Sequence, residues 1–269
     1  GSLQGILGEP LDSVFDVAKT LGFDGVELDW HSLDDATTGQ FAKSQRAELR
    51  RRAQNAGVEI PSVAAHFLNS GGIAANDETT RRSGLRAVQT GIELCRDLSA
   101  RVLLVPFFGP AEIVDEDGKK HLVESARKLA PIAQSANVKL GIEGALRGDE
   151  MAQLLSEIGS PFIGSYWDMA NCMSIGFDPL EEVQQLQSHI AQVHAKEFKG
   201  EARTRAYEYP NLNTVPFGSG DVPICAVLKK LRSVGYDGYI VLETGSFDDA
   251  KASARDALRV LTSAQAEIQ

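Results

Sequence analysis

Four mainly apolar segments of this sequence end in a residue that can ligate a cation or transfer a proton. These residues are Glu143, Asp168, His194 and Glu243. If three carboxylates meet at one point, each raises the pKa of the others unless a cation neutralises them. The residue types therefore predict one divalent metal ion. A ligand set with oxygen atoms, one nitrogen and no sulfur favours Mn²⁺, Mg²⁺ or Co²⁺, with Zn²⁺ as a less favoured alternative.

Each of these residues has a simpler interpretation when it is taken alone. A carboxylate after a strand is most often a helix cap or a member of a loop ion pair. A histidine in the same place is more often a hydrogen-bonded structural residue. The occurrence of all four at the ends of successive segments favours a shared site.

The segments that carry these residues belong to a repeating pattern of expected strands and helices. The expected strands cover residues 25–28, 58–65, 101–107, 139–143, 162–168, 190–195 and 239–243. They are short, rich in β-branched and apolar residues, and bounded by glycine, proline or polar residues, as buried strands are. The intervening stretches have helical spacing, for example the stripe Leu11, Val14, Phe15, Ala18 and Leu21.

This alternation predicts an α/β fold, and its length favours a (β/α)8 TIM barrel with an additional weak first strand near residues 5–7. A doubly wound open sheet is the competing architecture. One barrel would occupy residues 1–269 as a single domain, apart from Gly1-Ser2, which resembles an expression-tag remnant. Residues that end barrel strands emerge at the carboxyl-terminal rim, where barrel enzymes hold their active sites.

The composition argues against several classes of partner. The chain has 27 Lys and Arg against 37 Asp and Glu, a formal net charge of −10, which disfavours nucleic acid and anionic membranes. No apolar run is long enough to span a bilayer, and no signal peptide follows Ser2. Three widely separated cysteines indicate free thiols and a cytoplasmic protein. A homo-oligomer is one alternative for its assembly.

Several strings resemble those of the xylose isomerase-like TIM-barrel superfamily, specifically its sugar and sugar-phosphate isomerase/epimerase branch. They lie at residues 22–28, 141–143, 167–168, 193–197, 217–221 and 235–243. The resemblance extends over nearly the whole chain. It implies that Glu143, Asp168, His194 and Glu243 hold the metal, and that Glu143 and Glu243 also exchange protons with the substrate. A cation on the carbonyl and a neighbouring hydroxyl would stabilise the enediolate that forms.

The resemblance also implies residues that contact the substrate. His66 and Glu27 match positions that line the pocket in relatives, with a hydrogen-bonding role in the core as the alternative for each. Arg205 lies where relatives often place an arginine on the substrate, although Arg203 is nearby. Trp30 ends an expected strand and suits the apolar face of a sugar, with ordinary core packing as its alternative.

Other positions depart from the pattern of the ketose 3-epimerases in this superfamily. Those enzymes carry a histidine three residues after the metal-binding aspartate, where this chain has Asn171, and a glutamate six residues after the first ligand, where it has Asp149. Both positions touch substrate hydroxyls in the family. Lys196, in the string His-Ala-Lys-Glu, is expected to meet a substrate oxygen or to form a rim salt bridge.

The sequence thus predicts a metal-dependent isomerase or epimerase of a ketose, keto-polyol or sugar phosphate. A dehydratase or lyase that acts on a keto-cyclitol or an oxidised sugar through the same metal site is the first alternative, and a non-catalytic sugar-binding barrel is the second. The related apurinic-site nucleases use three zinc ions and additional histidines, whereas this acidic chain has five histidines in all. No Gly-rich nucleotide-binding motif is present in the sequence.

Overall fold

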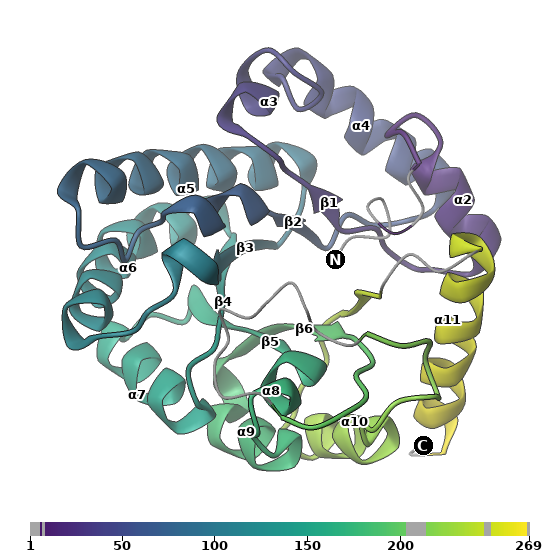
Figure 1. Ribbon diagram of the computed structural model, residues 1–269. Helices are drawn as coiled ribbons and strands as arrows, with labels where there is room; N and C mark the ends of the chain where they lie inside the picture. The colour runs from purple at the N-terminus through teal and green to yellow at the C-terminus, as the bar shows by residue number, and fades with distance from the viewer. Residues whose placement is uncertain (1–5, 7–8, 203–213, 245–248, 268–269) are drawn as a thin grey trace.

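A single parallel sheet forms the centre of the molecule. The computed structural model describes residues 6, 9–202, 214–244 and 249–267. In these residues the sheet has seven strands in chain order, which follow one another around the centre of Figure 1. The strands are β1 (Leu28–Asp29), β2 (Ser62–Ala64), β3 (Val102–Phe107), β4 (Lys139–Gly144), β5 (Ile163–Asp168), β6 (Ile190–Ala195) and β7 (Ile240–Leu242). This order confirms the predicted repeat, because parallel neighbours need a crossover between them.

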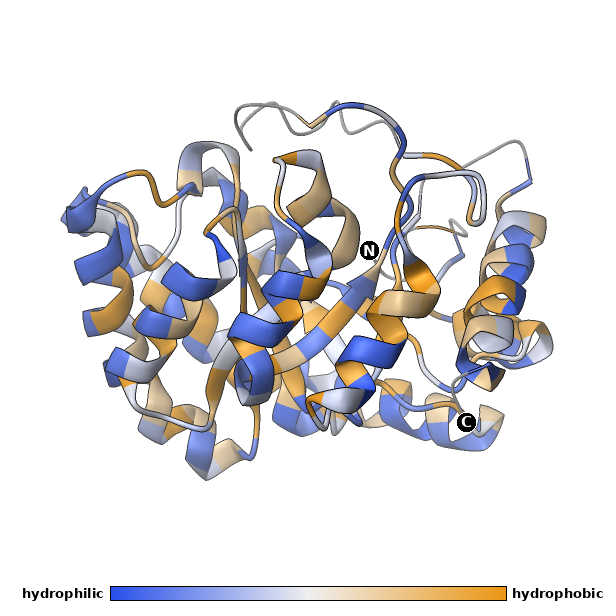
Figure 2. Cartoon of the chain, turned by 90° about the horizontal axis from the view of Figure 1, so that it is seen from below, coloured by the Kyte–Doolittle hydropathy of each residue, from blue (hydrophilic) through white to orange (hydrophobic). Residues whose placement is uncertain are grey.

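The helices lie outside the sheet and pack their apolar faces against it. They are α2 (Val14–Leu21), α3 (Leu33–Thr37), α4 (Lys43–Ala56), α5 (Glu78–Leu98), α6 (Glu116–Ala136), α7 (Gly148–Ile158), α8 (Met169–Ser174), α9 (Pro179–Leu186), α10 (Ile224–Ser233) and α11 (Ala250–Ala266). Figure 2 shows orange strands enclosed by helices that carry much of the blue, hydrophilic colour. The main core therefore lies between the sheet and the helices.

Alternation along the strands separates this core from the barrel interior. In β3, Leu103 and Val105 belong to the main core, whereas Val102 and Leu104 form a separate inner cluster with Ala64 and Tyr166. Successive side chains of a strand point to opposite faces, and paired residues of neighbouring strands share a face. The inner cluster therefore identifies which alternate positions point into the barrel.

Helices α2 and α11 are neighbours, which brings the two ends of the repeat together. Helix α11 packs against α2 (Figure 1), and Lys251 forms an ion pair with Glu9 at a distance of 2.7 Å. Of the strand expected at residues 5–7, only Ile6 is described; its side chain is buried, but its backbone is helical and is not paired into the sheet, so the expected strand is wrong at this residue. Gly5 and Leu7 lie outside the described residues, as does Gly1-Ser2.

Two further observations concern membranes and cysteines. Among the described helices, none combines the length and the apolar character needed to span a membrane. Cys95, Cys172 and Cys225 are free thiols, as the spacing of the cysteines predicts.

Candidate metal and active site

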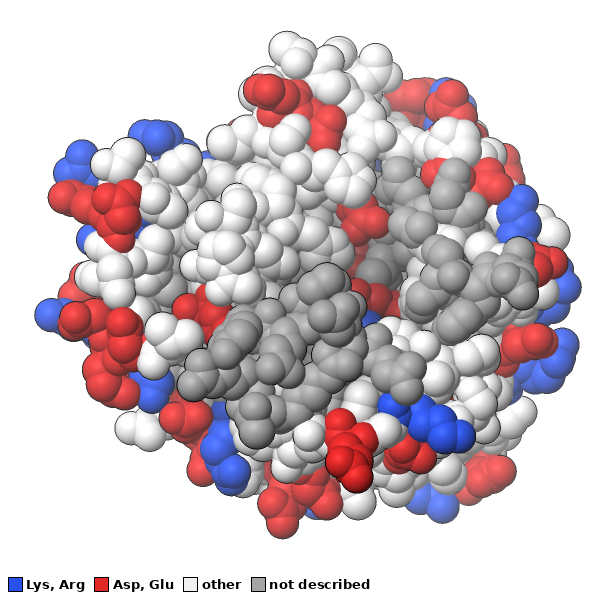
Figure 3. All heavy atoms as spheres, viewed as in Figure 1, with Lys and Arg blue, Asp and Glu red and all other residues white. Residues whose placement is uncertain are grey.

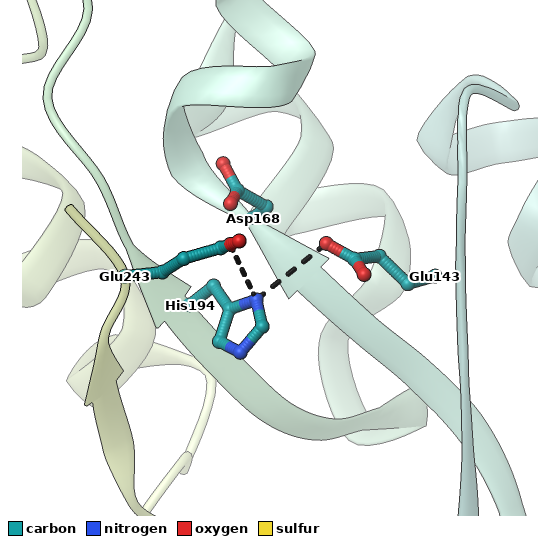
Figure 4. A group of neighbouring side chains, drawn as sticks. All are labelled: Glu143, Asp168, His194 and Glu243. Carbon is teal, nitrogen blue, oxygen red and sulfur yellow. Dashed lines mark ion pairs between the residues drawn. The ribbon is translucent and has the colours of Figure 1, made fainter. Parts of the chain in front are cut away.

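The four residues that end apolar segments point toward one another inside the barrel. Glu143 comes from β4, Asp168 ends β5, His194 lies in β6, and Glu243 follows β7 directly (Figure 4). Asp168 and His194 are paired residues of neighbouring strands, and the Glu243 N–H donates a hydrogen bond to Ala195 O. Strand pairing therefore fixes three of the four backbone positions relative to one another.

The side chains converge closely enough to share one ion. Each of the four offers one ligand atom, and these atoms all lie within 4.8 Å of one another. His194 Nδ1 lies 2.9 Å from Glu243 Oε2 and 3.5 Å from Glu143 Oε1, the two contacts drawn in Figure 4. Glu143, Asp168 and His194 are buried, and Glu243 is partly exposed. Separation from water makes this concentration of negative charge costly without a counter-charge.

Two observations on individual atoms fit a bound cation. Asp168 Oδ2 and His194 Nδ1 are buried, and neither has a hydrogen bond of good geometry with the described residues. Burial lowers the pKa of His194, yet the charge of Glu27 and the close approach of the Glu143 carboxylate outweigh it, so the net shift is upward. The cluster thus favours positive charge at its centre. Its carboxylate and imidazole donors suit a divalent metal ion.

Lys196 supplies positive charge at one side of the cluster. Its Nζ lies 3.1 Å from Asp168 Oδ2 and 2.8 Å from Glu243 Oε2, and the side chain is only 4% exposed. Burial raises the pKa of Asp168, but the charges of Lys196 and His194 outweigh burial and lower it. Lys196 is therefore a buried partner of two proposed ligands, in agreement with the salt-bridge alternative for this residue.

Asn171 also lies at the cluster. Its amide nitrogen donates to Glu143 Oε1 at 3.4 Å, and its amide oxygen accepts from Lys196 Nζ at 3.4 Å. Asp168 Oδ1 accepts hydrogen bonds from the backbone N–H groups of Ala170 and Asn171, and so caps α8. One carboxylate oxygen of Asp168 thus holds the local backbone, while the other faces the cluster.

Glu27 lies beneath the cluster and does not face the space above it. Its side chain is fully buried, and its Oε1 lies 3.0 Å from His194 Nε2. Its Oε2 accepts hydrogen bonds from Ser62 Oγ and Tyr166 OH. Burial raises the pKa of Glu27, but the charge of His194 and the hydrogen bonds with His194 and Tyr166 outweigh burial and bring the pKa well below its usual range. Both oxygens are occupied by protein groups, so the geometry favours the core hydrogen-bonding role over contact with substrate.

Trp30 lies on the outer face of the sheet, which the helices cover. It is fully buried in the main core, and a Cβ added to Gly91 of α5 would come within 2.8 Å of its ring. Its indole also packs edge-on against Phe67, with ring centroids 4.9 Å apart. The expected contact with a sugar face is corrected to core packing, because Trp30 follows Asp29 directly and its ring points toward the helices, away from the interior.

His66 and Asp29 form a second polar pair. His66 Nδ1 lies 3.2 Å from Asp29 Oδ1, and the imidazole is 34% exposed whereas the Asp29 side chain is 9% exposed. His66 is therefore accessible, as a substrate-contacting residue must be. Asp29 was not among the residues singled out from the sequence, although it occupies the same alternate position as Glu27. Arg205 lies outside the described residues.

The face that holds the cluster is hollowed near its centre. Figure 3 shows Asp and Glu atoms within this hollow, between white and grey surfaces. A small cavity of about 20 Å³ lies beside Glu143, Asp168 and Asn171, and it extends to Glu182. That volume is sufficient for about one water molecule.

Glu182 was also not anticipated, and it predicts a pH-dependent stability. It is a buried residue of α9, and its Oε1 accepts a hydrogen bond of 2.8 Å from Gly148 N at the start of α7. Burial raises its pKa from 4.5 to about 7, although Gly148 N–H and Arg147 oppose the shift. Between these two values the folded chain binds a proton that the unfolded chain does not. The free energy of unfolding should therefore fall as the pH rises, by up to about 3 kcal/mol in total.

Urea unfolding at pH 5 and pH 8 tests this expectation in wild type and in Glu182→Gln. Glutamine keeps an oxygen for Gly148 N–H but does not titrate, so the variant should lose most of the decrease that the wild type shows. Equal pH dependences in the two proteins would contradict the assignment to Glu182.

Comparisons with known proteins concern the family and the fold of this chain. The family model described as xylose isomerase-like TIM barrel matches residues 15–264. The L-ribulose-5-phosphate 3-epimerase UlaE of Escherichia coli (strain K12) is 25% identical over 238 residues, which cover 86% of this chain and 80% of UlaE.

Solved structures show the same fold. The IOLI protein, solved with a bound zinc atom, is 16% identical with a TM-score of 0.78, and the match covers 98% of this chain and 95% of that one. The D-psicose 3-epimerase of Clostridium cellulolyticum H10, solved with D-tagatose, is 14% identical with a TM-score of 0.75, and the match covers 97% and 94% of the two chains. The family match extends over most of the sequence, and this chain therefore belongs to the xylose isomerase-like TIM-barrel family.

Proposed function

We propose that this protein is a divalent-metal-dependent epimerase or isomerase of a ketose, keto-polyol or sugar phosphate. The observation that carries the proposal is the convergence of Glu143, Asp168, His194 and Glu243, whose ligand atoms lie within 4.8 Å of one another. Mn²⁺, Mg²⁺ or Co²⁺ suits these donors best. Zn²⁺ is the alternative, and a structural neighbour was solved with a zinc atom.

In this proposal, two carboxylates of the cluster move a proton. Glu143 and Glu243 come from different strands and approach His194 Nδ1 from different sides (Figure 4). A bound cation would stabilise the negative charge that develops on a carbonyl oxygen when the neighbouring carbon loses its proton. One carboxylate would remove that proton from one face of the carbon, and the other would return a proton to the opposite face.

Other buried groups would orient the sugar. Lys196 Nζ and the Asn171 amide lie within hydrogen-bonding reach of each other beside the carboxylates, and both can donate to substrate oxygens. His66, two residues after the end of β2, would approach with its partly exposed imidazole. UlaE is named for a sugar phosphate and the structural neighbour from Clostridium cellulolyticum for D-psicose, so both sugar phosphates and free ketoses are tested below.

A dehydratase or lyase is the second candidate, and two departures from the 3-epimerase pattern favour keeping it. Asn171 stands at the cluster where those enzymes carry a histidine. Asp149 is 56% exposed and pairs with Arg147 at the start of α7, so it does not join the cluster. Such an enzyme would remove the same proton and then expel a β-hydroxyl or a glycosidic oxygen. A non-catalytic sugar-binding barrel is less favoured, because all four ligands are present.

A substrate panel in D₂O distinguishes these functions. Protein prepared without chelator would be incubated with ketoses, ketose phosphates, inososes and oxidised glycosides, with each metal ion in turn, and followed by NMR. An epimerase gives the epimer with deuterium at the carbon next to the carbonyl. A dehydratase or lyase gives an unsaturated or cleaved product. Binding without exchange on any member of the panel would overturn the proposal of catalysis.

A further inference from the structure

A buried hydrogen-bond network lies below the metal cluster and ends on His194. Glu27 precedes β1, Ser62 begins β2, Tyr166 lies in β5, and Gln192 lies in β6 two residues before His194. The side chains of Glu27, Ser62, Tyr166 and Gln192 are each 4% exposed or less. Four separate strand regions thus contribute to one closed polar layer inside the barrel.

The network has a definite direction of hydrogen-bond donation. Gln192 Nε2 donates to Ser62 Oγ at 2.6 Å and to Tyr166 OH at 2.8 Å. Both hydroxyl oxygens therefore act as acceptors toward Gln192, and their protons are available for Glu27. Ser62 Oγ and Tyr166 OH donate to Glu27 Oε2 at 2.7 and 2.5 Å. The remaining oxygen, Oε1, faces His194 Nε2 at 3.0 Å.

This direction determines which imidazole nitrogen carries a proton. A carboxylate can only accept hydrogen bonds, so the contact with Glu27 Oε1 requires a proton on His194 Nε2. Nδ1 lies beside Glu143 and Glu243 but makes no hydrogen bond of good geometry with the described residues, so its lone pair is available on that side. We propose that Glu27 is a positioning residue that fixes the His194 tautomer and ring orientation, and that Ser62, Tyr166 and Gln192 hold Glu27 for this role. The expected effect of Glu27 on metal affinity rests on the metal site proposed above.

The same geometry explains why a carboxylate is needed at position 27. A glutamine there would present one amide oxygen and one amide nitrogen. If the oxygen faced His194, the NH₂ group would meet the Ser62 and Tyr166 hydroxyls, which already receive protons from Gln192. If the NH₂ group faced His194, it would favour the tautomer with the proton on Nδ1, which is the wrong one for a ligand.

Two measurements on Glu27→Gln test the proposal. Competition with a chelator should show metal affinity reduced about 10- to 100-fold, the usual effect of removing a group that orients a ligand. Nitrogen NMR of histidine-labelled, metal-free protein, at a pH where His194 is neutral, should show Nε2–H in the wild type and a mixed or reversed tautomer in the variant. Tyr166→Phe is a graded comparison: it removes one of the two donors to Glu27 Oε2 and keeps the contact with His194, so the Nε2–H tautomer should remain and the metal affinity should fall less than in Glu27→Gln.

The two measurements distinguish a failure of the proposed role of Glu27 from a failure of the proposed function. An Nδ1–H tautomer in metal-free wild type would overturn the proposal, even if Glu27→Gln does not fold. An unchanged tautomer together with metal affinity within threefold of the wild type in Glu27→Gln would overturn it as well. Absence of metal binding in the wild type would contradict the proposed function, while the tautomer of His194 would still test the role of Glu27.

Discussion

Glu243→Gln is expected to lose epimerisation, about 10²- to 10⁴-fold in kcat, while one substrate epimer still exchanges its proton with solvent. The reason is the placement of two carboxylates on different strands, each able to serve one face of the reacting carbon. Without Glu243, Glu143 can remove and return a proton on its own face only. Glu143→Gln should show the reverse pattern, with exchange of the opposite epimer.

Deuterium incorporation into each purified epimer measures this pattern, and metal content must be measured in the same samples. Glu157→Gln provides the matched control, because Glu157 is an exposed residue of α7 that pairs with Arg127. It should retain the activity of the wild type. Loss of exchange in both epimers with full metal occupancy, in either variant, would contradict the assignment of one carboxylate to each face.

Asp168→Asn is expected to lower metal affinity strongly with little effect on the metal-free fold. Asparagine retains an oxygen that can accept from Ala170 N and Asn171 N, and it is also a good helix cap. The NH₂ group of asparagine takes the place of the second carboxylate oxygen, Oδ2, which faces the cluster. In the wild type, free metal at 100 times its Kd should raise the free energy of unfolding by about 2.7 kcal/mol.

Chemical unfolding with and without metal measures this effect. If the substitution raises Kd about 100-fold, the same metal concentration should stabilise Asp168→Asn by only about 0.4 kcal/mol. Unfolding in the presence of a chelator serves as the reference for both proteins. Equal stabilisation of wild type and variant would show that the metal binds elsewhere, and no stabilisation of the wild type would remove the basis for a metal site.

The sequence was most informative where residues that can ligate a metal ion recur at one structural position, the end of a strand. Glu143, Asp168, His194 and Glu243 each end a short apolar segment, and parallel strands place all such ends at the same edge of the sheet. The convergence of these residues could therefore be predicted without knowledge of any contact. The repeating strands could be predicted as well, because their periodicity is local.

The roles of the neighbouring residues depended on information that is not local. Alternation shows that Glu27 and Trp30 point to opposite faces, but only the packing of neighbouring strands shows which face is the interior. The pairing of β5 with β6 also shifts register between Ser165 and Tyr166, which a sequence pattern does not reveal. This pairing helps to set the level of Tyr166 relative to His194.

By itself, then, the sequence determined the strand–helix repeat and the chemical types at the strand ends, because both follow from short-range patterns of polarity. Only the tertiary structure decided that Glu27 supports His194 from below, that Trp30 packs against α5, and that Lys196 lies between Asp168 and Glu243. Those roles depend on distances between strands that are far apart along the chain, and such distances are fixed only when the sheet curls and brings the strands together.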